Sequence, residues 1–534
     1  MIVPSFFVCC FSQHFLVGNS IQMYSYVYTA TTCGIDSMMI SVEADISNGM
    51  PMFSMVGFLS SEVKESKDRV RTALKNSGFE LPVKRITVNF SPANVRKSGS
   101  GFDLPVAVAV LSAMGQVEKE RLGACMIVGE LSLEGKISPV TGVLSMVLCA
   151  KEAGLRQCIV PIDNEREARF IPGIEIVGVS CLREVIWYLN TGEHIESEHK
   201  EVNRTEGQKS IIHDFAEING QRLLRRACEV AISGMHNLLM VGPPGAGKTM
   251  VAKCIPSILP PMTLEEQIEL SKIYSLCGLF RERESLMEQR PYRNPHHTIS
   301  EPGLTGGGKE PKPGEISLAH GGVLFLDELT DFKKSTLEVL RQPMEDKEVT
   351  IARVNGTYCF PANFVLVAAM NPCNCGYYPD MSKCRCSQTS IQRHMDKLSQ
   401  PLLDRIDLCV EVSAVGYDDL THTCMENESS RQIRNRVIKM HELQKERFRG
   451  THILFNSGIP AKELQRFCPL GEKEMRYMEE MYKKMDLTAR TYHKIVRVAR
   501  TIADMDGAEC ISRKHLQEAI CYRGIDRRYW ENCL

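Results

Sequence analysis

The stretch HNLLMVGPPGAGKT, residues 236–249, decides the fold of the central part of the chain. It begins with an apolar run typical of a buried strand and ends in a match to the phosphate-loop pattern G-x-x-x-x-G-K-[ST] at every fixed position. The glycines of such a loop let backbone N–H groups point at phosphates, while Lys248 would reach the β- and γ-phosphates and Thr249 would bind Mg²⁺. We therefore expect ATP and Mg²⁺ at Gly242, Pro243, Pro244, Gly245, Ala246, Gly247, Lys248 and Thr249.

Two further apolar runs end in polar residues that would complete a hydrolytic site. The run GGVLFLDE (321–328) ends in Asp327 and Glu328, and NFVLVAAMNP (363–372) carries Asn371 at its tip. Asp327 can hold Mg²⁺ and its water shell, Glu328 can polarise the attacking water, and Asn371 can orient that water or contact the γ-phosphate. Alone, an Asp-Glu pair or an Asn-Pro step indicates a turn, and it is the position after apolar strands that favours function.

The same runs predict an α/β fold. Continuous apolar strands separated by helices, such as the helix expected over 222–234, imply a parallel sheet covered on both faces. In an open α/β sheet the functional residues follow the carboxyl ends of the strands. The polar tips of the three runs are therefore expected at one edge of one sheet.

The chain has 534 residues, which suggests about three domains. Residues 23–190 alternate between strand-like and helix-like segments, and the charged stretch 191–210 is expected to be a linker. Residues 211–415 form the predicted nucleotide-binding core, and residues 416–534 are helical and charged. Residues 1–22 lack a basic start and a cleavage site, so we expect a gene-model artefact before Met23 or, alternatively, a short amphipathic arm.

Composition restricts the function classes. The formal net charge is −1, so any binding of nucleic acid must come from a local patch or from a ring of subunits facing a pore. The 21 cysteines are mostly scattered singly in apolar stretches, which fits a reducing cytoplasm better than a disulfide framework. No segment is suited to crossing a membrane.

One group of cysteines differs from the rest, because Cys373, Cys375, Cys384 and Cys386 form the pattern C-x-C-x8-C-x-C. Two thiolate pairs on facing arms can close a tetrahedral zinc site that staples a polar loop. The alternatives are four reduced cysteines in a mobile loop, or a redox pair. His394 is expected to be an ordinary polar residue.

The pair His296-His297 is not expected to bind a metal. Neighbouring residues on a regular element point in different directions and seldom share one ion. A structural or pore-loop role is expected for this pair.

These motifs together resemble those of AAA+ ATPases and, more closely, of the ComM/YifB family of magnesium-chelatase-like ATPases. The resemblance rests on RPYRNPHHTIS, GGGKEPKPGEISLAHGGVLFLDEL, MNPCNCGYYPD and SQPLLDRIDL, and on the N-terminal KESKDRVRTALKNSGFELP. It covers nearly all of 23–525. It implies an N-terminal Lon-protease-like (S5-like) domain, an AAA+ core, a C-terminal helical lid and a homo-hexameric ring.

In such a ring, ATP lies between subunits and an arginine of the neighbour can stabilise the charge of the transition state. The resemblance makes Arg405, in LLDRIDL, the candidate for that arginine. It makes Arg490, in LTARTYHKIVRVAR, the candidate for a lid arginine that contacts the γ-phosphate of its own subunit, with Arg497 as the second choice. The alternative for each arginine is a surface salt bridge.

Proteolysis of the Lon type needs a serine nucleophile and a lysine that activates it. In the segments that resemble the serine- and lysine-bearing ones, Phe102 and Leu144 stand at those positions. Ser98, Ser100 and Lys136 lie nearby but out of place. We expect a non-catalytic domain that serves assembly or partner binding.

The resemblance implies a DNA motor that drives branch migration during transformation or recombination. Its partners would be single-stranded or branched DNA, other copies of the chain and recombination proteins. Candidate pore contacts are Arg293, Lys309 and Lys312, with flexibility from the glycines at 306–308. The alternative is a magnesium-chelatase-like or protein-remodelling ATPase. A nucleotide-binding scaffold with little hydrolysis is disfavoured by Asp327 and Glu328.

Overall fold

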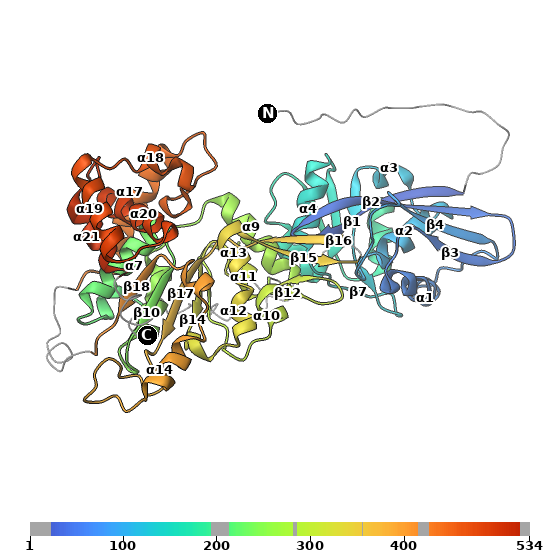
Figure 1. Cartoon of the computed structure of the whole chain (residues 1–534). Coiled ribbons are helices and arrows are strands. Elements are labelled where there is room, and N and C mark those ends of the chain that lie inside the picture. Colours follow the sequence, from blue (N-terminus) through green and yellow to red (C-terminus); the bar gives the residue numbers. More distant parts are fainter. Residues whose placement is uncertain (1–22, 194–212, 281–285, 355, 415–426, 524–534) are drawn as a thin grey trace.

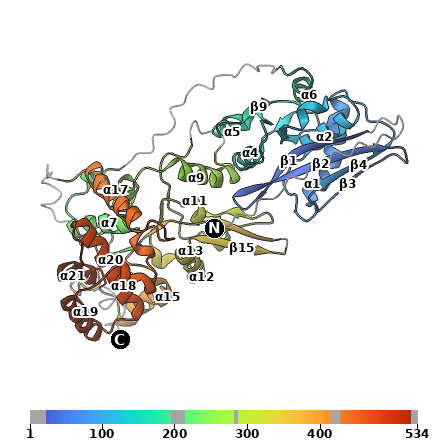
Figure 2. The same ribbon diagram turned by 90° about the horizontal axis from the view of Figure 1, so that it is seen from above.

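The protein is described here from a computed structural model that covers residues 23–193, 213–280, 286–354, 356–414 and 427–523. The expected leader 1–22 and most of the expected linker 191–210 lie outside the described residues. In two views at right angles, a strand-rich N-terminal unit and a helical C-terminal unit lie at opposite ends, with the central core between them (Figures 1 and 2).

The N-terminal unit is built on a seven-stranded mixed sheet in the order β3-β4-β2-β1-β5-β8-β9. Strand β1 alternates exposed and buried residues over YSYVYT because only one face of this part of the sheet is covered. Helix α2 covers that face, and each of its residues is buried. The strands of the unit are β1 (Tyr24–Cys33), β2 (Asp36–Ser47), β3 (Met52–Val56), β4 (Arg85–Ser91), β5 (Cys125–Ile127), β6 (Glu130–Leu131), β7 (Ile137–Ser138), β8 (Gln157–Pro161) and β9 (Glu175–Val179). Its helices are α1 (Ser61–Asn76), α2 (Asp103–Ala113), α3 (Lys119–Leu122), α4 (Val143–Glu152), α5 (Glu165–Ala168) and α6 (Leu182–Thr191).

The core contains the parallel sheet that the apolar runs predict, in the order β11-β14-β17-β10-β18. Alternate residues of β10 enter different hydrophobic cores: Leu238 and Met240 face α7 and the C-terminal helices, whereas Leu239 and Val241 face α12 to α15. The predicted covering of both faces is therefore confirmed. The strands are β10 (Leu238–Val241), β11 (Tyr292–Arg293), β14 (Val323–Leu326), β17 (Val365–Met370) and β18 (Leu408–Glu411). The helices are α7 (Arg222–Gly234), α8 (Lys248–Cys254), α9 (Leu264–Leu276), α10 (Glu301–Thr305), α11 (Glu315–Leu318), α12 (Lys334–Glu338), α13 (Arg341–Asp346), α14 (Gln388–Met395) and α15 (Gln400–Leu403).

Two hairpins project from the core toward the N-terminal unit (Figure 1). They are β12 (Gly306–Gly307) with β13 (Lys312–Pro313), and β15 (Glu348–Arg353) with β16 (Gly356–Pro361). The turn between β1 and β2 lies against β16, since a Cβ at Gly34 would be 2.8 Å from the carbonyl oxygen of Cys359. Helix α9 also holds the two units together: Ser275 Oγ donates to Glu167 at 2.8 Å, and Lys272 pairs with Asp36 at 2.8 Å.

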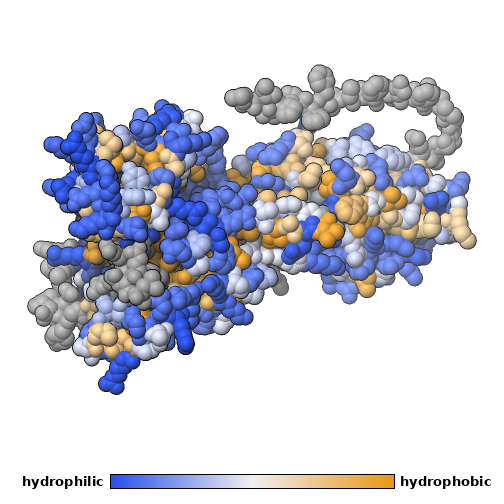
Figure 3. Space-filling view, viewed as in Figure 1, coloured by the Kyte–Doolittle hydropathy of each residue, from blue (hydrophilic) through white to orange (hydrophobic). Residues whose placement is uncertain are grey.

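The C-terminal unit is helical, as predicted, with α17 (Ser430–Arg447), α18 (Leu464–Phe467), α19 (Glu472–Lys484), α20 (Ala489–Met505) and α21 (Arg513–Cys521). Its helix α17 begins at a capping box on Ser429. The unit packs on the carboxyl end of α7, where His236 shares a hydrogen bond with Thr501 at 2.9 Å and Gln444 donates to the carbonyl of Ser233 at 2.7 Å. In Figure 3 this unit is mainly hydrophilic, whereas apolar residues are exposed over much of the N-terminal unit. Within the described ranges, no helix is both long and apolar enough to cross a membrane.

Candidate ATP-hydrolysis site

The eight predicted nucleotide-binding residues form the loop between β10 and α8. Gly245 and Gly247 have φ values of +75° and +84°, which side chains other than glycine rarely adopt. Gly242 lies so close to the next strand that a Cβ would be 2.3 Å from the carbonyl oxygen of Val412. The glycines are therefore required by the loop backbone and by its contact with the end of β18.

Lys248 lies at the centre of this loop and is 8% exposed. Its ammonium donates to the carbonyls of Gly242 at 2.6 Å and Pro243 at 2.8 Å, and to Asn371 Oδ1 at 3.1 Å. Burial lowers the pKa of Lys248 to about 8, and the nearby Asp327 opposes this shift. These three acceptors are neutral oxygens, so the bound phosphates of a nucleotide would supply a counter-charge for the ammonium.

Asp327 and Thr249 also meet at this edge of the sheet. Thr249 Oγ1 donates to Asp327 Oδ2 at 2.8 Å, and Asp327 Oδ1 accepts from the backbone N–H of Glu328 at 3.0 Å. A hydroxyl and a carboxylate are oxygen ligands that suit Mg²⁺. The predicted metal-binding pair therefore lies together, beside the phosphate loop.

Glu328 follows in the left-handed region, with φ of +51°, and its side chain is 58% exposed. Its carboxylate Oε2 lies 3.6 Å from Nδ1 of His297. The ring of His297 also lies near two other rings, that of His296 at a centroid distance of 4.1 Å and that of Phe332 at 6.4 Å. No neighbour of Glu328 is predicted from the sequence. The position of His297 shortly after β11 could have indicated one, because β11 pairs with β14, the strand that Glu328 follows.

His394 is a second residue whose position differs from expectation. It is 6% exposed, and its Nε2 donates to the backbone carbonyl of Asn371 at 3.0 Å. His394, expected from the sequence to be an ordinary polar residue, thus holds the backbone of Asn371, a predicted site residue. Burial lowers the pKa of His394, which favours the neutral ring.

The two predicted arginines lie at the opposite edge of the sheet. Arg405 precedes β18, and its carbonyl accepts from Asn237 Nδ2 at 3.0 Å, beside the start of β10. The phosphate loop follows the other end of β10. The Arg405 guanidinium is 10% exposed and pairs with Glu345 at 2.7 Å. Arg405 is therefore separated from the phosphate loop of its own chain by the length of the sheet.

Arg490 lies at the same edge as Arg405, 3.8 Å from the carboxylate of Asp404. This position does not suit the expected contact of Arg490 with the γ-phosphate of its own subunit, because the loop and Asp404 lie at opposite ends of the strands. Arg497, the second choice, has a buried Nε without a hydrogen-bond partner in the described structure. Burial lowers the pKa of Arg497.

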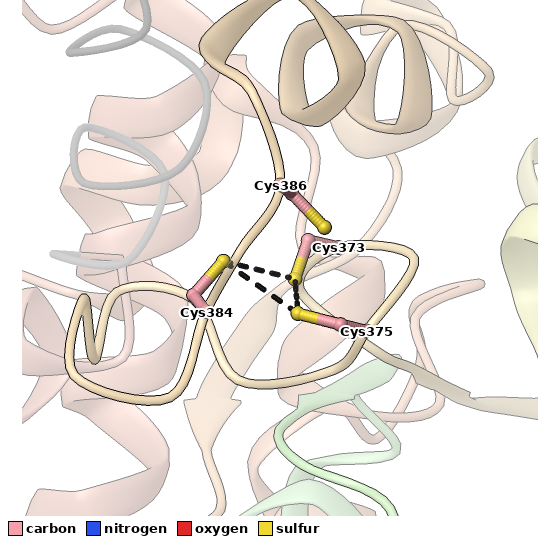
Figure 4. A group of neighbouring side chains, drawn as sticks. All are labelled: Cys373, Cys375, Cys384 and Cys386. Carbon is pink, nitrogen blue, oxygen red and sulfur yellow. Dashed lines mark hydrogen bonds between the residues drawn. The ribbon is translucent and has the colours of Figure 1, made fainter.

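The four predicted cysteines converge, as Figure 4 shows. Their Sγ atoms all lie within 4.8 Å of one another, and the closest pair, Cys373 and Cys375, is 3.3 Å apart. A tetrahedral zinc site with Zn–S bonds of about 2.3 Å would space its sulfurs roughly 3.8 Å apart. The backbone N–H of Tyr377 lowers the pKa of Cys375 to about 6, and that of Tyr378 donates to Cys373 Sγ at 3.4 Å. The group is compatible with zinc.

The comparisons with known proteins cover all three units. Residues 214–420 match the family described as "Magnesium chelatase, subunit ChlI", residues 42–164 match "Subunit ChlI of Mg-chelatase", and residues 427–523 match "Magnesium chelatase, subunit ChlI C-terminal". The chain is 40% identical over 505 residues to the competence protein ComM of Haemophilus influenzae and 39% identical over 503 residues to the protein YifB of Escherichia coli. Each alignment covers 94% of this chain and 97% of the relative. The chain belongs to the ComM/YifB family.

Membership of the ComM/YifB family confirms the AAA+ core that the phosphate loop, Asp327 and Asn371 predicted. The Lon-like N-terminal unit is confirmed by similarity to Lon protease 2 of Bacillus subtilis, which is 29% identical over 147 residues, or 27% of this chain and 26% of that protein. In this ComM/YifB member Phe102 and Leu144, at the expected serine and lysine positions, are 2% and 0% exposed within hydrophobic cores. The side chain of Lys136 is 75% exposed and pairs with Glu134 at 3.0 Å.

The candidate pore residues of this family member divide into two groups. Lys309 and Lys312 are exposed at the β12–β13 hairpin. Arg293 differs from these lysines, because its Nε and Nη2 both donate to Glu315 at 2.6 Å. Among the glycines at 306–308, Gly306 is required by close packing, since a Cβ there would be 2.3 Å from the carbonyl oxygen of Lys312.

Proposed function

We propose that this protein is a DNA motor whose subunits assemble into a homo-hexameric ring and hydrolyse ATP at their interfaces. The observation that carries the proposal is the separation of Lys248, Thr249 and Asp327 from Arg405 on opposite edges of one sheet. An arginine so placed reaches a nucleotide only on an adjacent copy of the chain. A closed ring satisfies this requirement for every subunit.

The chemistry of each interface follows from the residues of the two copies. Bound Mg²⁺, held by Thr249 and Asp327, would neutralise charge on the phosphates, and Lys248 would hold the β- and γ-phosphates. Glu328 would take up the proton of the attacking water. Arg405 of the adjacent copy would stabilise the charge of the transition state. We propose that Arg490, at the same edge as Arg405, acts on the same neighbouring nucleotide.

DNA is favoured as the polymer for two reasons. The relative from Haemophilus influenzae is named a competence protein, and transformation requires handling of incoming DNA. The exposed lysines 309 and 312 stand on a hairpin that the core projects, where contacts with a phosphate backbone would be independent of sequence. Branch migration of DNA joints, with recombination proteins as partners, is the activity we propose.

The N-terminal unit is proposed to be non-catalytic. A nucleophilic serine and its lysine must lie within hydrogen-bond reach in a partly open site. Here the two expected positions hold buried apolar side chains, and Lys136, which lies eight residues before Leu144, is paired with Glu134 in solvent. We propose assembly or partner binding as the work of this unit.

We further propose that the four cysteines hold a structural Zn²⁺. Metal analysis of the purified protein by plasma emission spectroscopy should find one zinc per chain. A Cys384→Ser variant should lose most of that zinc, and a Cys468→Ser variant, which removes a buried cysteine outside the cluster, should keep it. A metal-free native protein with a cysteine disulfide would contradict the zinc assignment and support the redox alternative.

The decisive experiment combines sizing with an ATPase assay on single-stranded, duplex and branched DNA. We expect a hexamer in the presence of nucleotide, hydrolysis stimulated by DNA, and conversion of a Holliday junction to products. A Lys309→Ala, Lys312→Ala variant should bind DNA less tightly and with a weaker salt dependence. A confirmed hexamer whose hydrolysis is indifferent to every DNA would refute the DNA motor.

The second candidate is a magnesium-chelatase-like or protein-remodelling ATPase, and the family descriptions favour it. Neighbouring genes for tetrapyrrole synthesis would support it, whereas neighbouring recombination genes would support the DNA motor. Stimulation of hydrolysis by a porphyrin-binding partner or a protein substrate, and not by DNA, would be the biochemical evidence.

A further inference from the structure

The loop that carries the four cysteines packs directly on the phosphate loop. Gly376, inside the cysteine-bearing loop, has φ of +84°, and a Cβ built on it would lie 2.4 Å from Cδ of Pro244 and 3.6 Å from its backbone nitrogen. Only glycine fits, both because of the left-handed backbone and because Pro244 occupies the space. The backbone of the cysteine loop is therefore packed on the loop expected to hold the phosphates.

Both ends of the cysteine loop are attached to Asn371. At its start, Cys373 follows Asn371 by two residues, and Asn371 Oδ1 accepts from the ammonium of Lys248 at 3.1 Å. At its end, Ser387 caps α14, the helix that presents His394 to the backbone carbonyl of Asn371 at 3.0 Å. The cysteine loop thus contacts Pro244 of the phosphate loop and is joined at both ends to elements that hold Asn371.

The loop has few apolar side chains of its own apart from the cysteines and Tyr378, which pack on the core. Three of its four sulfurs are within 3.8 Å of one another, and the loop also contains polar and exposed residues such as Asn374 and Lys383. A tetrahedral metal would fix the two arms relative to each other. Without that link, the loop would be held by the packing of Cys373, Cys384 and Tyr378 on the core and by a few polar contacts.

We propose that the cysteine cluster is a metal-dependent brace of the nucleotide site, which couples metal occupancy to nucleotide affinity through Gly376 on Pro244 and through Asn371. The inference rests on the zinc assignment proposed above. Because such a coupling is reciprocal, a bound nucleotide must tighten the binding of the metal by the same factor with which the metal tightens the binding of the nucleotide.

The brace is tested by nucleotide binding, measured by fluorescence with an ATP analogue, in the full-length protein without DNA. Gly376→Ala leaves all four thiols in place, so it should keep its zinc but lose about tenfold in nucleotide affinity. Gly450→Ala is the matched control, because Gly450 has φ of +78° and nothing within 4 Å of the added Cβ. A Gly376→Ala protein that binds nucleotide like the control would overturn the brace.

The metal dependence has a separate readout in the unmodified protein. A chelator should remove zinc severalfold more slowly when the ATP analogue is bound, and the zinc-depleted protein should regain nucleotide affinity when zinc is returned. Equal rates of zinc loss with and without nucleotide would refute the coupling. Neither measurement involves hydrolysis or DNA, so failure of the proposed motor function would leave both results unaffected.

Discussion

The parallel strands of the core sheet have one edge at their carboxyl ends and one at their amino ends, and the charged residues at these two edges differ. At the carboxyl edge, the Lys248 ammonium is held by neutral oxygens in a buried position, and the pair Thr249 and Asp327 faces the same space. At the amino edge, Arg405 and Arg490 are each placed against a carboxylate, Glu345 and Asp404. The first edge is arranged to receive phosphates, and the second holds the largely buried Arg405 and the exposed Arg490 beside acidic partners. This difference is the basis of our proposal that a nucleotide site is completed by an adjacent copy of the chain.

The largest expected effect tests the carboxyl edge alone. Glu328→Gln removes the proposed base without changing the shape of the side chain, so hydrolysis should fall about 1000-fold while nucleotide binding is retained. Turnover in a steady-state phosphate-release assay is the measurement. Glu120→Gln, in the N-terminal unit, is the control. Unchanged turnover in Glu328→Gln would show that another group activates the water.

The next effect tests whether the two edges act together across subunits. Arg405→Ala should lower hydrolysis about 100-fold, because arginines of this kind contribute at least that much to phosphoryl transfer. Lys248→Ala should also lose hydrolysis, because it removes the ammonium proposed to hold the phosphates. Rings assembled from a mixture of the two variants should regain activity, since some interfaces then pair an intact phosphate loop with an intact arginine. A mixture that stays inactive although mixed rings form would place Arg405 in its own subunit's site.

A smaller effect is expected for His297, which lies beside Glu328 at the carboxyl edge. His297→Ala should lower the rate of hydrolysis about tenfold with little change in nucleotide affinity, because the carboxylate loses the ring that positions it. His296→Ala keeps that contact and should stay within about twofold of the native protein. Equal kcat values for His297→Ala and the native protein would mean that the contact has no part in turnover.

The smallest effect is a pH dependence of nucleotide binding. Burial lowers the pKa of Lys248 to about 8, so the ammonium that binds phosphate is lost as the pH rises above 8. Bound phosphates would raise this pKa, and binding then takes up a proton. Between pH 7.5 and 9 the affinity for an ATP analogue should fall roughly eightfold, provided that the pKa in the complex lies well above 9. Lys248→Arg remains charged and should show a flat profile. An equally flat profile in the native protein would contradict the lowered pKa.

The same pKa shift predicts a direction for stability. Since the folded pKa of Lys248 lies below the ordinary value of 10.5, the unfolded chain binds more protons between these values. The nucleotide-free protein should therefore gain stability from this group as the pH rises from about 8 to 10.5, and the cost of burying the ammonium is fully present below pH 8.

Much of the core could be predicted because its signals are local. The phosphate loop is continuous in sequence, and its glycines, Lys248 and Thr249 have fixed spacings that reflect the geometry of one turn. The apolar runs ending at Asp327 and Asn371 predicted parallel strands with their tips at one edge, and the structure places Thr249 against Asp327 and Lys248 against Asn371. The spacing of the four cysteines likewise indicated a closed cluster, since two short arms joined by a turn bring their ends together.

The misses lie where distant elements meet. His297 and Glu328 are brought together by the pairing of β11 with β14, and His394 reaches Asn371 only because α14 folds back over the end of β17. Nothing in the sequence indicated that Arg293 pairs with Glu315, which lies 22 residues further along the chain. Each of these contacts depends on which strands are neighbours, a property that residue spacing along one segment does not contain.

The sequence by itself determined what kind of site the chain carries: a phosphate loop, a carboxylate pair, an asparagine and four thiols, because each is a short motif whose geometry is local. Only the tertiary structure decided that the cysteine loop packs on the phosphate loop and that His394 donates to the backbone of Asn371. The order β11-β14-β17-β10-β18 differs from the order along the chain, so β10 lies between β17 and β18 and the phosphate loop meets Asp327, Asn371 and the cysteine loop. The same order sends Arg405 to the far edge, because a parallel strand that follows a helix must begin at the edge where its neighbours begin.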